Sequence, residues 1–363
     1  MEDFAAGITH DQPTRRQSTL GGEWDARIHQ LVSDWGAEKS PELVEEMIIT
    51  VLKMARDKMG TADLKLMTRS IKEMRYAAKV FAGYREFRKI CVFGSARTLP
   101  TAPEYPVAEE FAREMVAQNY MVITGGGDGI MGAANHGAGR EHSFGLNIRL
   151  PFEQRANETI FGDSKLINFN YFFTRKLNFV KETHALALFP GGFGTMDEGF
   201  EVLTLMQTGK ARIIPVVMID SAEGTYWEEW LKFLTDHLAK LGFVSPEDFH
   251  LFKIVHSAKD AVAEILQFYK VYHSARWVGD QLVIRILRPL SKAAVADLNA
   301  KFRDVIRTGE IVQGSALRQE KNEPAIWTLP RLIVSPYRRS FARFRELIDA
   351  INLAELAPIQ TEA

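Results

Sequence analysis

The chain has 363 residues, of which 46% are hydrophobic and 25% are charged, a composition that is ordinary for a globular protein of two or three domains. Its formal net charge of -1 excludes a global electrostatic attraction to nucleic acid or to an anionic membrane. The single cysteine, Cys91, excludes an internal disulfide and a cysteine-based zinc site. No apolar run approaches the roughly 20 residues that a membrane helix needs.

The N-terminal part is predicted to be a polar tail followed by helices. Residues 1–22 lack the apolar core of a secretory signal, so we expect a flexible tail in a cytoplasmic protein. Residues 23–88 are predicted to form a helical extension, in which Ser40 is the N-cap of one helix. A second helical stretch is predicted over 64–87. The first of these helices has apolar residues at helical spacing, namely Leu43, Met47, Val51 and Met54. The extension is expected to cover a sheet edge or to build a subunit interface.

Residues 89–270 alternate between predicted strands and helices. The predicted strands are short apolar runs at Ile90–Gly94, Tyr120–Thr124, Gly145–Leu150, Leu186–Phe189 and Ile213–Ile219. The helices between them include Glu104–Gln118, Gly129–Gly139 and Phe169–Glu182. This alternation predicts an α/β fold with a doubly wound parallel sheet covered by helices on both faces. If the strand order is 3-2-1-4-5, the first and fourth strands are neighbours, and a crevice opens at their carboxyl ends.

Residues 271–363 show a different pattern, which predicts a small separate α+β domain of the order β-α-β-β-α. Its predicted strands are Gln281–Leu287, Ile311–Leu317 and Leu332–Pro336, and its predicted helices are Ser291–Arg307 and Ser340–Leu353.

Three glycine-rich turns follow strands of the predicted parallel sheet. The most informative one, Pro190–Glu198, directly follows the apolar run Ala185–Phe189 and leads into a helix. Such a turn directs backbone N–H groups and a helix dipole at one point, which suits a phosphate group. The turns at 94–97 and 125–129 are expected to lie beside it around one crevice. Together they predict a binding site for a phosphorylated small molecule.

Charged side chains near this crevice have either a purely structural role or a role in ligand binding. Asp197, Glu198 and Glu201 complement a helix dipole at its N-terminus, but Glu198 and Glu201 also share one helix face and would contact a ligand if that face looks into the crevice. Arg175 and Lys176 are either solvated charges on long stems, or Arg175 reaches the crevice and binds an anionic or polar substrate group.

The run Gly127–Gly132 matches G-x-G-x-x-G after a strand, so dinucleotide binding is an alternative, with Glu153 near the following strand as the acid that would hold a ribose. Against this alternative, the run follows the second strand instead of the first and leaves the turn at Pro190 unexplained. The glycines would equally permit a tight turn without any ligand. No histidine spacing typical of a metal site is present, and Cys91 is expected to be a core residue.

The segments Gly125–Gly132, Arg175-Lys176 and Pro190–Glu198 occur in an order and spacing that resemble the LOG ("Lonely guy") family, whose members are often mislabelled as lysine decarboxylases. The resemblance covers roughly 89–268. It implies a Rossmann-like fold and a nucleoside 5′-monophosphate phosphoribohydrolase, which cleaves AMP or cytokinin riboside monophosphates to a free base and ribose 5-phosphate. It also implies a homodimer or higher homo-oligomer, and neither a metal nor another cofactor.

The resemblance assigns catalysis to Arg175 and Glu198. The positions expected to bind substrate are Gly94, Ser95, Gly126, Gly127, Gly129, Met131, Lys176, Gly191, Gly192, Gly194 and Thr195. Short family members usually carry G-S-S where this chain has Gly94-Ser95-Ala96, and Arg97 adds a cation near the crevice. We therefore expect AMP or another purine monophosphate as the substrate. A nucleotide-binding regulator without turnover is the alternative, which the C-terminal domain and Arg97 motivate.

Overall fold

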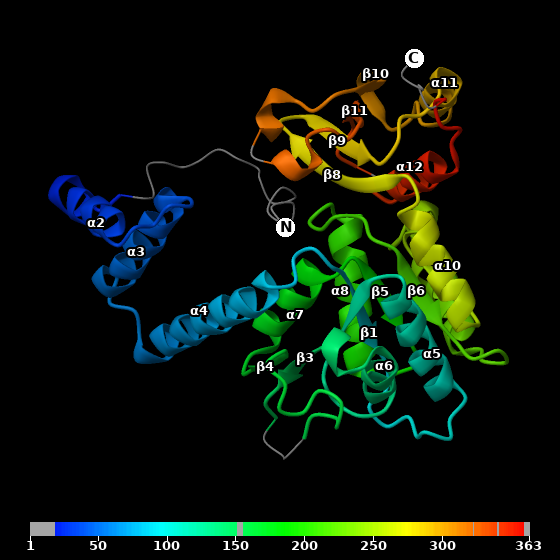
Figure 1. Cartoon of the computed structure of the whole chain (residues 1–363), viewed down its shortest axis with the longest axis horizontal. Helices are drawn as coiled ribbons and strands as arrows, with labels where there is room; N and C mark the ends of the chain where they lie inside the picture. The colour runs from blue at the N-terminus through cyan, green and yellow to red at the C-terminus, as the bar shows by residue number, and fades with distance from the viewer. Residues whose placement is uncertain (1–18, 151–154, 322, 340, 359–363) are drawn as a thin grey trace. The chain divides into compact units, whose positions relative to one another are not determined.

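The computed structural model describes residues 19–150, 155–321, 323–339 and 341–358 (Figure 1). Within this part, the chain divides into two compact units, one ending at Tyr76 and the other beginning at Ala77. The predicted acid Glu153 and the first 18 residues of the predicted tail lie outside the described residues.

The N-terminal unit is helical, as the sequence predicts. It contains α2 (Gly22–Asp34), α3 (Pro41–Arg56) and the larger part of α4 (Thr61–Ala82). Its small core consists of Ile28, Val32 and Ile49. Ser40 occupies the N-cap position of α3, as predicted, but its backbone is left-handed with φ 49° and its side chain makes no capping hydrogen bond. The predicted apolar stripe of α3 does not form this core either, and Ile49 is the one buried residue of that helix.

The second unit is built on a seven-stranded sheet in which every neighbouring pair is parallel. Its order is β4-β3-β2-β1-β5-β6-β7. The strands are β1 (Arg88–Phe93), β2 (Tyr120–Thr124), β3 (Ser143–Ile148), β4 (Leu166–Phe169), β5 (Ala185–Leu188), β6 (Val216–Ile219) and β7 (Lys253–Val255). The predicted strands therefore occupy the middle of the sheet in the predicted order, with β1 beside β5, and the doubly wound α/β fold is confirmed.

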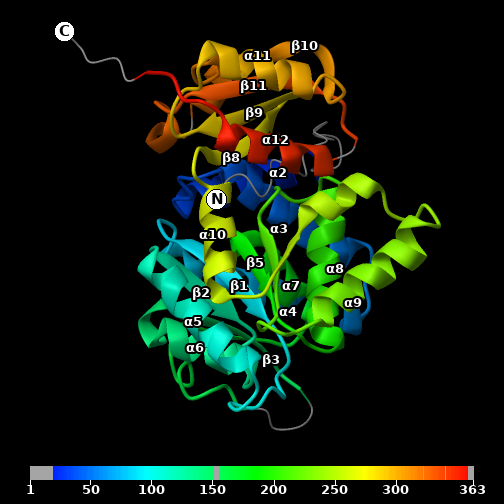
Figure 2. The ribbon, with the colours of Figure 1, turned by 90° about the vertical axis from the view of Figure 1, so that its right-hand side faces the viewer.

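Helices cover both faces of this sheet (Figure 2). One face packs against α5 (Glu104–Ala117), α6 (Ile130–Ala138) and α10 (Ala258–Phe268). The other face packs against α7 (Phe172–Glu182), α8 (Phe193–Gln207) and the end of α4. The helix α9 (Tyr226–Phe233) contributes the buried Trp227 to the same core. The strand interiors are buried on both sides, which explains their continuous apolar sequences.

The sequence-based bounds are wrong at two places in this sheet. The predicted helix 169–182 begins only at Phe172, because Leu166–Phe169 is an edge strand that pairs with β3. The short strand β7 at the opposite edge is also missing from the prediction.

The C-terminal part forms a four-stranded antiparallel sheet of order β10-β11-β9-β8. Its strands are β8 (Tyr272–Val278), β9 (Gln281–Ile286), β10 (Ile306–Gly314) and β11 (Arg331–Pro336). Two helices, α11 (Lys292–Lys301) and α12 (Ala342–Leu353), share its hydrophobic core. The predicted order lacks β8, and the predicted helix 291–307 is too long because β10 begins at Ile306.

No helix within the described ranges combines the length and the apolar character that a bilayer crossing requires. The cytoplasmic location stays a prediction.

Candidate functional site

The three glycine-rich turns lie in contact at the carboxyl ends of β1, β2 and β5. The backbone N–H of Ser95 donates to the carbonyl of Pro190 at 3.0 Å, and the N–H of Ile130 donates to the carbonyl of Ser95 at 3.1 Å. The turn after β1 therefore joins the other two. This is the arrangement that the strand order demands, because neighbouring parallel strands end at one edge of the sheet.

Some of these glycines are required by close packing and others leave space open. A Cβ atom at Gly191 would lie 2.1 Å from Oγ1 of Thr195, and one at Gly129 would lie 2.3 Å from the carbonyl oxygen of Ser95. Gly129 also has a φ of +63°, which side chains rarely adopt. In contrast, no atom lies within 4 Å of a Cβ built at Gly192 or Gly194. The first turn of α8 therefore borders open space.

The N-terminus of α8 has the features of an anion site. Gly192 is its N-cap, and no side-chain hydrogen bond from the described residues caps it. The first N–H groups of a helix have no partners within the helix, and the helix dipole adds partial positive charge there. A phosphate placed at this end would accept hydrogen bonds from these groups.

Arg175 and Glu198 face each other across the two helices α7 and α8. Nη2 of Arg175 lies 3.5 Å from Oε1 of Glu198, and Nζ of Lys176 lies 3.5 Å from Oε2 of the same carboxylate. The Glu198 side chain is 3% exposed and that of Arg175 is 13% exposed. The low exposure of Arg175 disagrees with its interpretation as a solvated charge, whereas both interpretations of Glu198 stay open. Lys176 also pairs with Asp197 at 2.8 Å and with Glu201 at 2.7 Å.

Two polar atoms of this pair remain without a hydrogen-bond partner within the described part of the chain. They are Nε of Arg175 and Oε1 of Glu198, both buried. Buried polar atoms are nearly always satisfied, so these two atoms mark a place where a polar group of a ligand would be accommodated. Burial raises the pKa of Glu198 to about 7, although Lys176 and Arg175 act in the opposite direction. A carboxyl group that titrates near neutral pH is suited to acid–base or electrostatic roles.

The remaining predicted site residues lie around the same turns. Gly94 packs on Ile130, since a Cβ there would meet its side chain at 2.6 Å. The hydroxyl of Ser95 accepts a hydrogen bond from the N–H of Arg97 at 3.1 Å. In the turn after β2, Gly126 has a φ of +77° and donates its N–H to Oγ1 of Thr124. The side chain of Met131 packs on Gly125, since a Cβ at Gly125 would lie 2.8 Å from the sulfur of Met131.

Arg97 lines a groove that is separate from the Arg175–Glu198 pair. The groove has a volume of about 460 Å³, and its lining comes from the turns after β1 and β2, from α5 and α6, and from residues 157–159. Its other charged or titratable members are Tyr105, Asp128, His136 and Glu158. No residue of α7 or α8 contributes to it.

Sequence reasoning missed two residues that hold the turns. The N–H and Nδ2 of Asn157 donate to the carbonyls of Gly126 and Gly127, at 2.8 and 2.9 Å. The hydroxyl of Tyr226 donates to the carbonyl of Gly191 at 2.5 Å. Neither residue belongs to a local motif, because each reaches its turn from about 30 or more positions away in sequence.

Cys91 is fully buried in β1, as expected for a core residue, and burial raises the pKa of its thiol. No group of histidine, cysteine, aspartate and glutamate side chains among the described residues could hold a metal ion.

A parallel sheet with glycine turns at one edge and an uncapped helix N-terminus defines a Rossmann-like α/β protein. Residues 131–265 match the family model described as "Possible lysine decarboxylase". This match confirms the resemblance to the LOG proteins, and the curated LOG relatives align with about half of the chain.

Curated relatives carry phosphoribohydrolase names. The chain is 28% identical over 204 residues to cytokinin riboside 5′-monophosphate phosphoribohydrolase LOG1 of Arabidopsis thaliana. The aligned region covers 54% of this chain and 93% of LOG1. The chain is 24% identical to the probable enzyme LOGL2 of Oryza sativa subsp. japonica, over 54% of this chain and 81% of that protein.

Solved structures with a similar fold cover about half of the chain. The structural genomics target TM1055 is 21% identical with a TM-score of 0.35, over 50% of this chain and 99% of that chain. The molybdenum cofactor carrier protein from Chlamydomonas reinhardtii is 18% identical with a TM-score of 0.34, over 50% of this chain and 97% of that chain.

Proposed function

We propose that the protein hydrolyses the N-glycosidic bond of a nucleoside 5′-monophosphate, AMP or another purine monophosphate, to the free base and ribose 5-phosphate. The observation that carries this proposal is the buried Glu198, five positions after the start of the uncapped helix α8. The phosphoribohydrolase names of the matched relatives support the same class of reaction.

The 5′-phosphate binds at the N-terminus of α8. Gly192 and Gly194 provide backbone N–H groups, and the absence of side chains at the two glycines leaves room for the phosphate oxygens. The N–H of Thr195 donates to the carbonyl of Gly192 at 3.1 Å, so this predicted residue contributes by its position in the first turn. Binding energy from the phosphate, which does not react, then orients the ribose at the bond to be broken.

Glu198 lies along the same helix, about 7.5 Å from its first residue at a rise of about 1.5 Å per residue. Departure of the base leaves positive charge on the ribose, as in glycoside hydrolysis. The Glu198 carboxylate stabilises this charge and orients a water molecule for attack on C1′. Its buried position strengthens the effect because little solvent screens the interaction.

Arg175 acts on the opposite side of this carboxylate. Its Nη2 contacts Glu198, while its Nε is unpaired within the described residues and remains available for a polar group of the substrate. The guanidinium also lies 4.9 Å from the ring centroid of Phe172, a contact that helps to fix its orientation. We infer that Arg175 positions the carboxylate and holds the substrate or the leaving base.

The test is chromatographic detection of free adenine from AMP, with adenosine as the control for the phosphate. Glu198→Gln is expected to lower kcat by about 100-fold or more, the size of one lost electrostatic contact to a transition state. Asp197→Asn is the matched control, because it removes a neighbouring carboxylate that is 58% exposed. Equal rates on AMP and adenosine would contradict the proposal that the bound phosphate orients the ribose.

A regulator that binds nucleotides without turnover is the second candidate. The groove beside Arg97 favours it, because this cationic residue borders about 460 Å³ of space away from Glu198. Saturable binding of AMP with no release of adenine over hours would establish this alternative and exclude hydrolysis.

We further propose that the active form is a homodimer or higher homo-oligomer. Large apolar side chains are exposed on the two helices that carry the site, namely Phe172, Phe173, Leu177, Phe193 and Phe200. Phe193, at the first position of α8, is 95% exposed. Several exposed large apolar side chains on neighbouring helices are typical of protein interfaces. Light scattering after size-exclusion chromatography measures the mass, and a monomer at micromolar concentration would contradict this proposal.

A further inference from the structure

A second pocket lies between the C-terminal sheet and the segment that follows α8. Gly209, Ala211 and Arg212 form one wall, and residues of β8, β9 and α12 form the other. Its volume is about 60 Å³. Since one water needs about 10–15 Å³ by the same measure, the pocket has room for a single small ring but not for a whole nucleotide.

Aromatic rings line this pocket. Trp277 and Phe344 are in edge contact with ring centroids 6.4 Å apart, and Phe341 and Phe344 are 5.4 Å apart. The guanidinium of Arg338 lies 4.6 Å from the Trp277 centroid. Rings held in this way present flat apolar surface, which favours a planar ligand.

The pocket is also cationic. Arg212 and Arg276 both line it, and the Nε atom of each is buried without a hydrogen-bond partner among the described residues. A buried N–H group without an acceptor is unfavourable, so these two guanidinium groups are not satisfied by the described residues alone. Guanidinium groups bind planar anions such as carboxylates particularly well.

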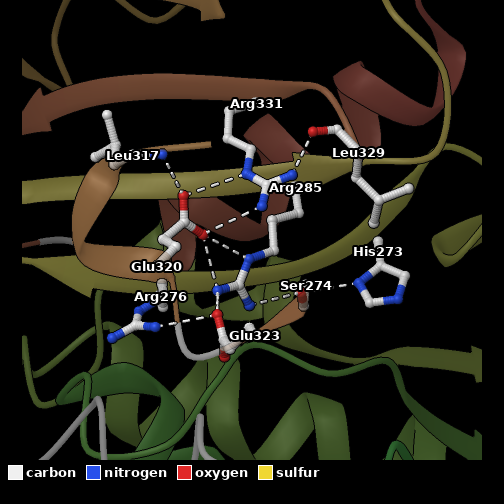
Figure 3. A network of polar contacts seen from close by, with 9 residues as sticks. All are labelled: His273, Ser274, Arg276, Arg285, Leu317, Glu320, Glu323, Leu329 and Arg331. Atoms are coloured by element: carbon white, nitrogen blue, oxygen red, sulfur yellow. Dashed lines mark hydrogen bonds and ion pairs between the residues drawn. The ribbon is translucent and has the colours of Figure 1, made fainter. Parts of the chain in front are cut away.

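The acidic side chains that pair with Arg276 and its neighbours do not neutralise the positive charge at the pocket (Figure 3). Nη1 of Arg276 pairs with Glu323 at 3.0 Å, but Glu323 also pairs with Arg285. Arg285 and Arg331 share the second carboxylate, Glu320. The residues drawn in this network thus include three arginines and two glutamates, which leaves one positive charge in excess.

The pocket contacts the ends of both helices that carry the proposed catalytic pair. Nη2 of Arg212 donates to the carbonyl of Thr183, the C-cap of α7. Gly209 follows the end of α8, and its φ of +69° and close contact with the Phe341 ring fix the turn there. A ligand that restrains Arg212 and Phe341 in their present positions would therefore restrain the ends of α7 and α8.

We propose that this pocket binds a small planar organic anion of the aromatic carboxylate class, and that binding stabilises α7 and α8. The carboxylate pairs with the guanidinium groups of Arg212 and Arg276, and the ring packs against Trp277 and Phe341. Binding at the C-terminal sheet is then coupled to the site that Arg175 and Glu198 form at the other part of these helices.

The first experiment measures binding of benzoate to the full chain by calorimetry and ligand-observed NMR. Benzamide has the same shape without the charge, and cyclohexanecarboxylate has the charge without the flat ring. We expect saturable benzoate binding that is about ten-fold tighter than that of either analogue. Absence of saturable binding, or equal affinity for all three compounds, would overturn the proposal.

Two variants locate the site. Arg212→Gln removes the cation, and Ala275→Leu fills the pocket while leaving both arginines in place. Each is expected to lower the affinity for benzoate by about ten-fold or more. The control Arg113→Gln, at a residue 58% exposed on α5, is expected to leave this affinity unchanged. Unaltered affinity in both pocket variants would place benzoate elsewhere and refute the assignment.

The second experiment measures amide hydrogen exchange with and without saturating benzoate. Slower exchange in α7 and α8 is expected, because the ligand restrains the ends of both helices. Unchanged exchange in these helices would refute the coupling. Neither experiment uses a nucleotide, so their outcome is independent of whether the protein hydrolyses AMP.

Discussion

Replacement of Glu198 by glutamine separates catalysis from stability. The pKa of this buried carboxyl is raised from 4.5 to about 7, so the folded protein favours its neutral form. This difference corresponds to about 3 kcal/mol of folding free energy, from about 1.4 kcal/mol for each tenfold change in the acid constant. The contribution is fully present below pH 4.5 and is lost as the pH rises through about 7.

Glutamine resembles the neutral carboxyl group and does not ionise. Glu198→Gln is therefore expected to be more stable than the wild type at pH 8.5, by at most about 3 kcal/mol, and nearly equal to it at pH 5. The same change is expected to lower kcat on AMP by about 100-fold. In the wild type, kcat is expected to fall as the pH drops below about 7, because the carboxylate is the active form.

Urea denaturation at the two pH values measures the stabilities, and adenine release over the same range measures kcat. A variant that loses stability equally at both pH values would refute the argument that burial disfavours the ionised form of this carboxyl group. A wild-type rate that rises below pH 7 would assign Glu198 the role of a proton donor and refute its role as an anion.

Further predictions concern the glycine turn and the buried charges. Gly191→Ala is expected to lower the Tm and abolish activity, because its Cβ would lie 2.1 Å from a neighbouring side chain, whereas Gly192→Ala keeps the Tm and weakens AMP binding. Differential scanning fluorimetry and AMP titration check both, and equal Tm losses would contradict the packing argument. Glu320→Gln is expected to cost about 3–5 kcal/mol in urea denaturation, because two fully buried arginines lose their shared carboxylate. Asp280→Asn breaks exposed ion pairs instead and should cost less than about 1 kcal/mol; equal costs would contradict the buried network.

The centre of the α/β sheet was predictable because its strands are continuous apolar runs that end at glycine turns. The edge strands were not, since β4 reads Leu-Ile-Asn-Phe next to an aromatic helix start and β7 has only three residues. In the C-terminal part, β8 reads Tyr-His-Ser-Ala-Arg-Trp-Val, which has neither a continuous apolar run nor a regular alternation, and its pairing with β9 depends on the tertiary fold.

The candidate site was predictable where a local motif defines it. Sequence placed Glu198 and Glu201 on one helix face but could not distinguish them. The structure does, because Lys176 pairs with Glu201 at the surface while Glu198 lies buried against Arg175. Asn157 and Tyr226 were missed because their contacts with the glycine turns depend on the tertiary fold.

A crystal structure of the Glu198→Gln variant with AMP tests the central claim most directly. We expect the phosphate on the backbone N–H groups of Gly192 and Gly194, and the C1′ atom of the ribose beside residue 198. A phosphate bound in the groove at Arg97, with the ribose remote from α8, would contradict the claim.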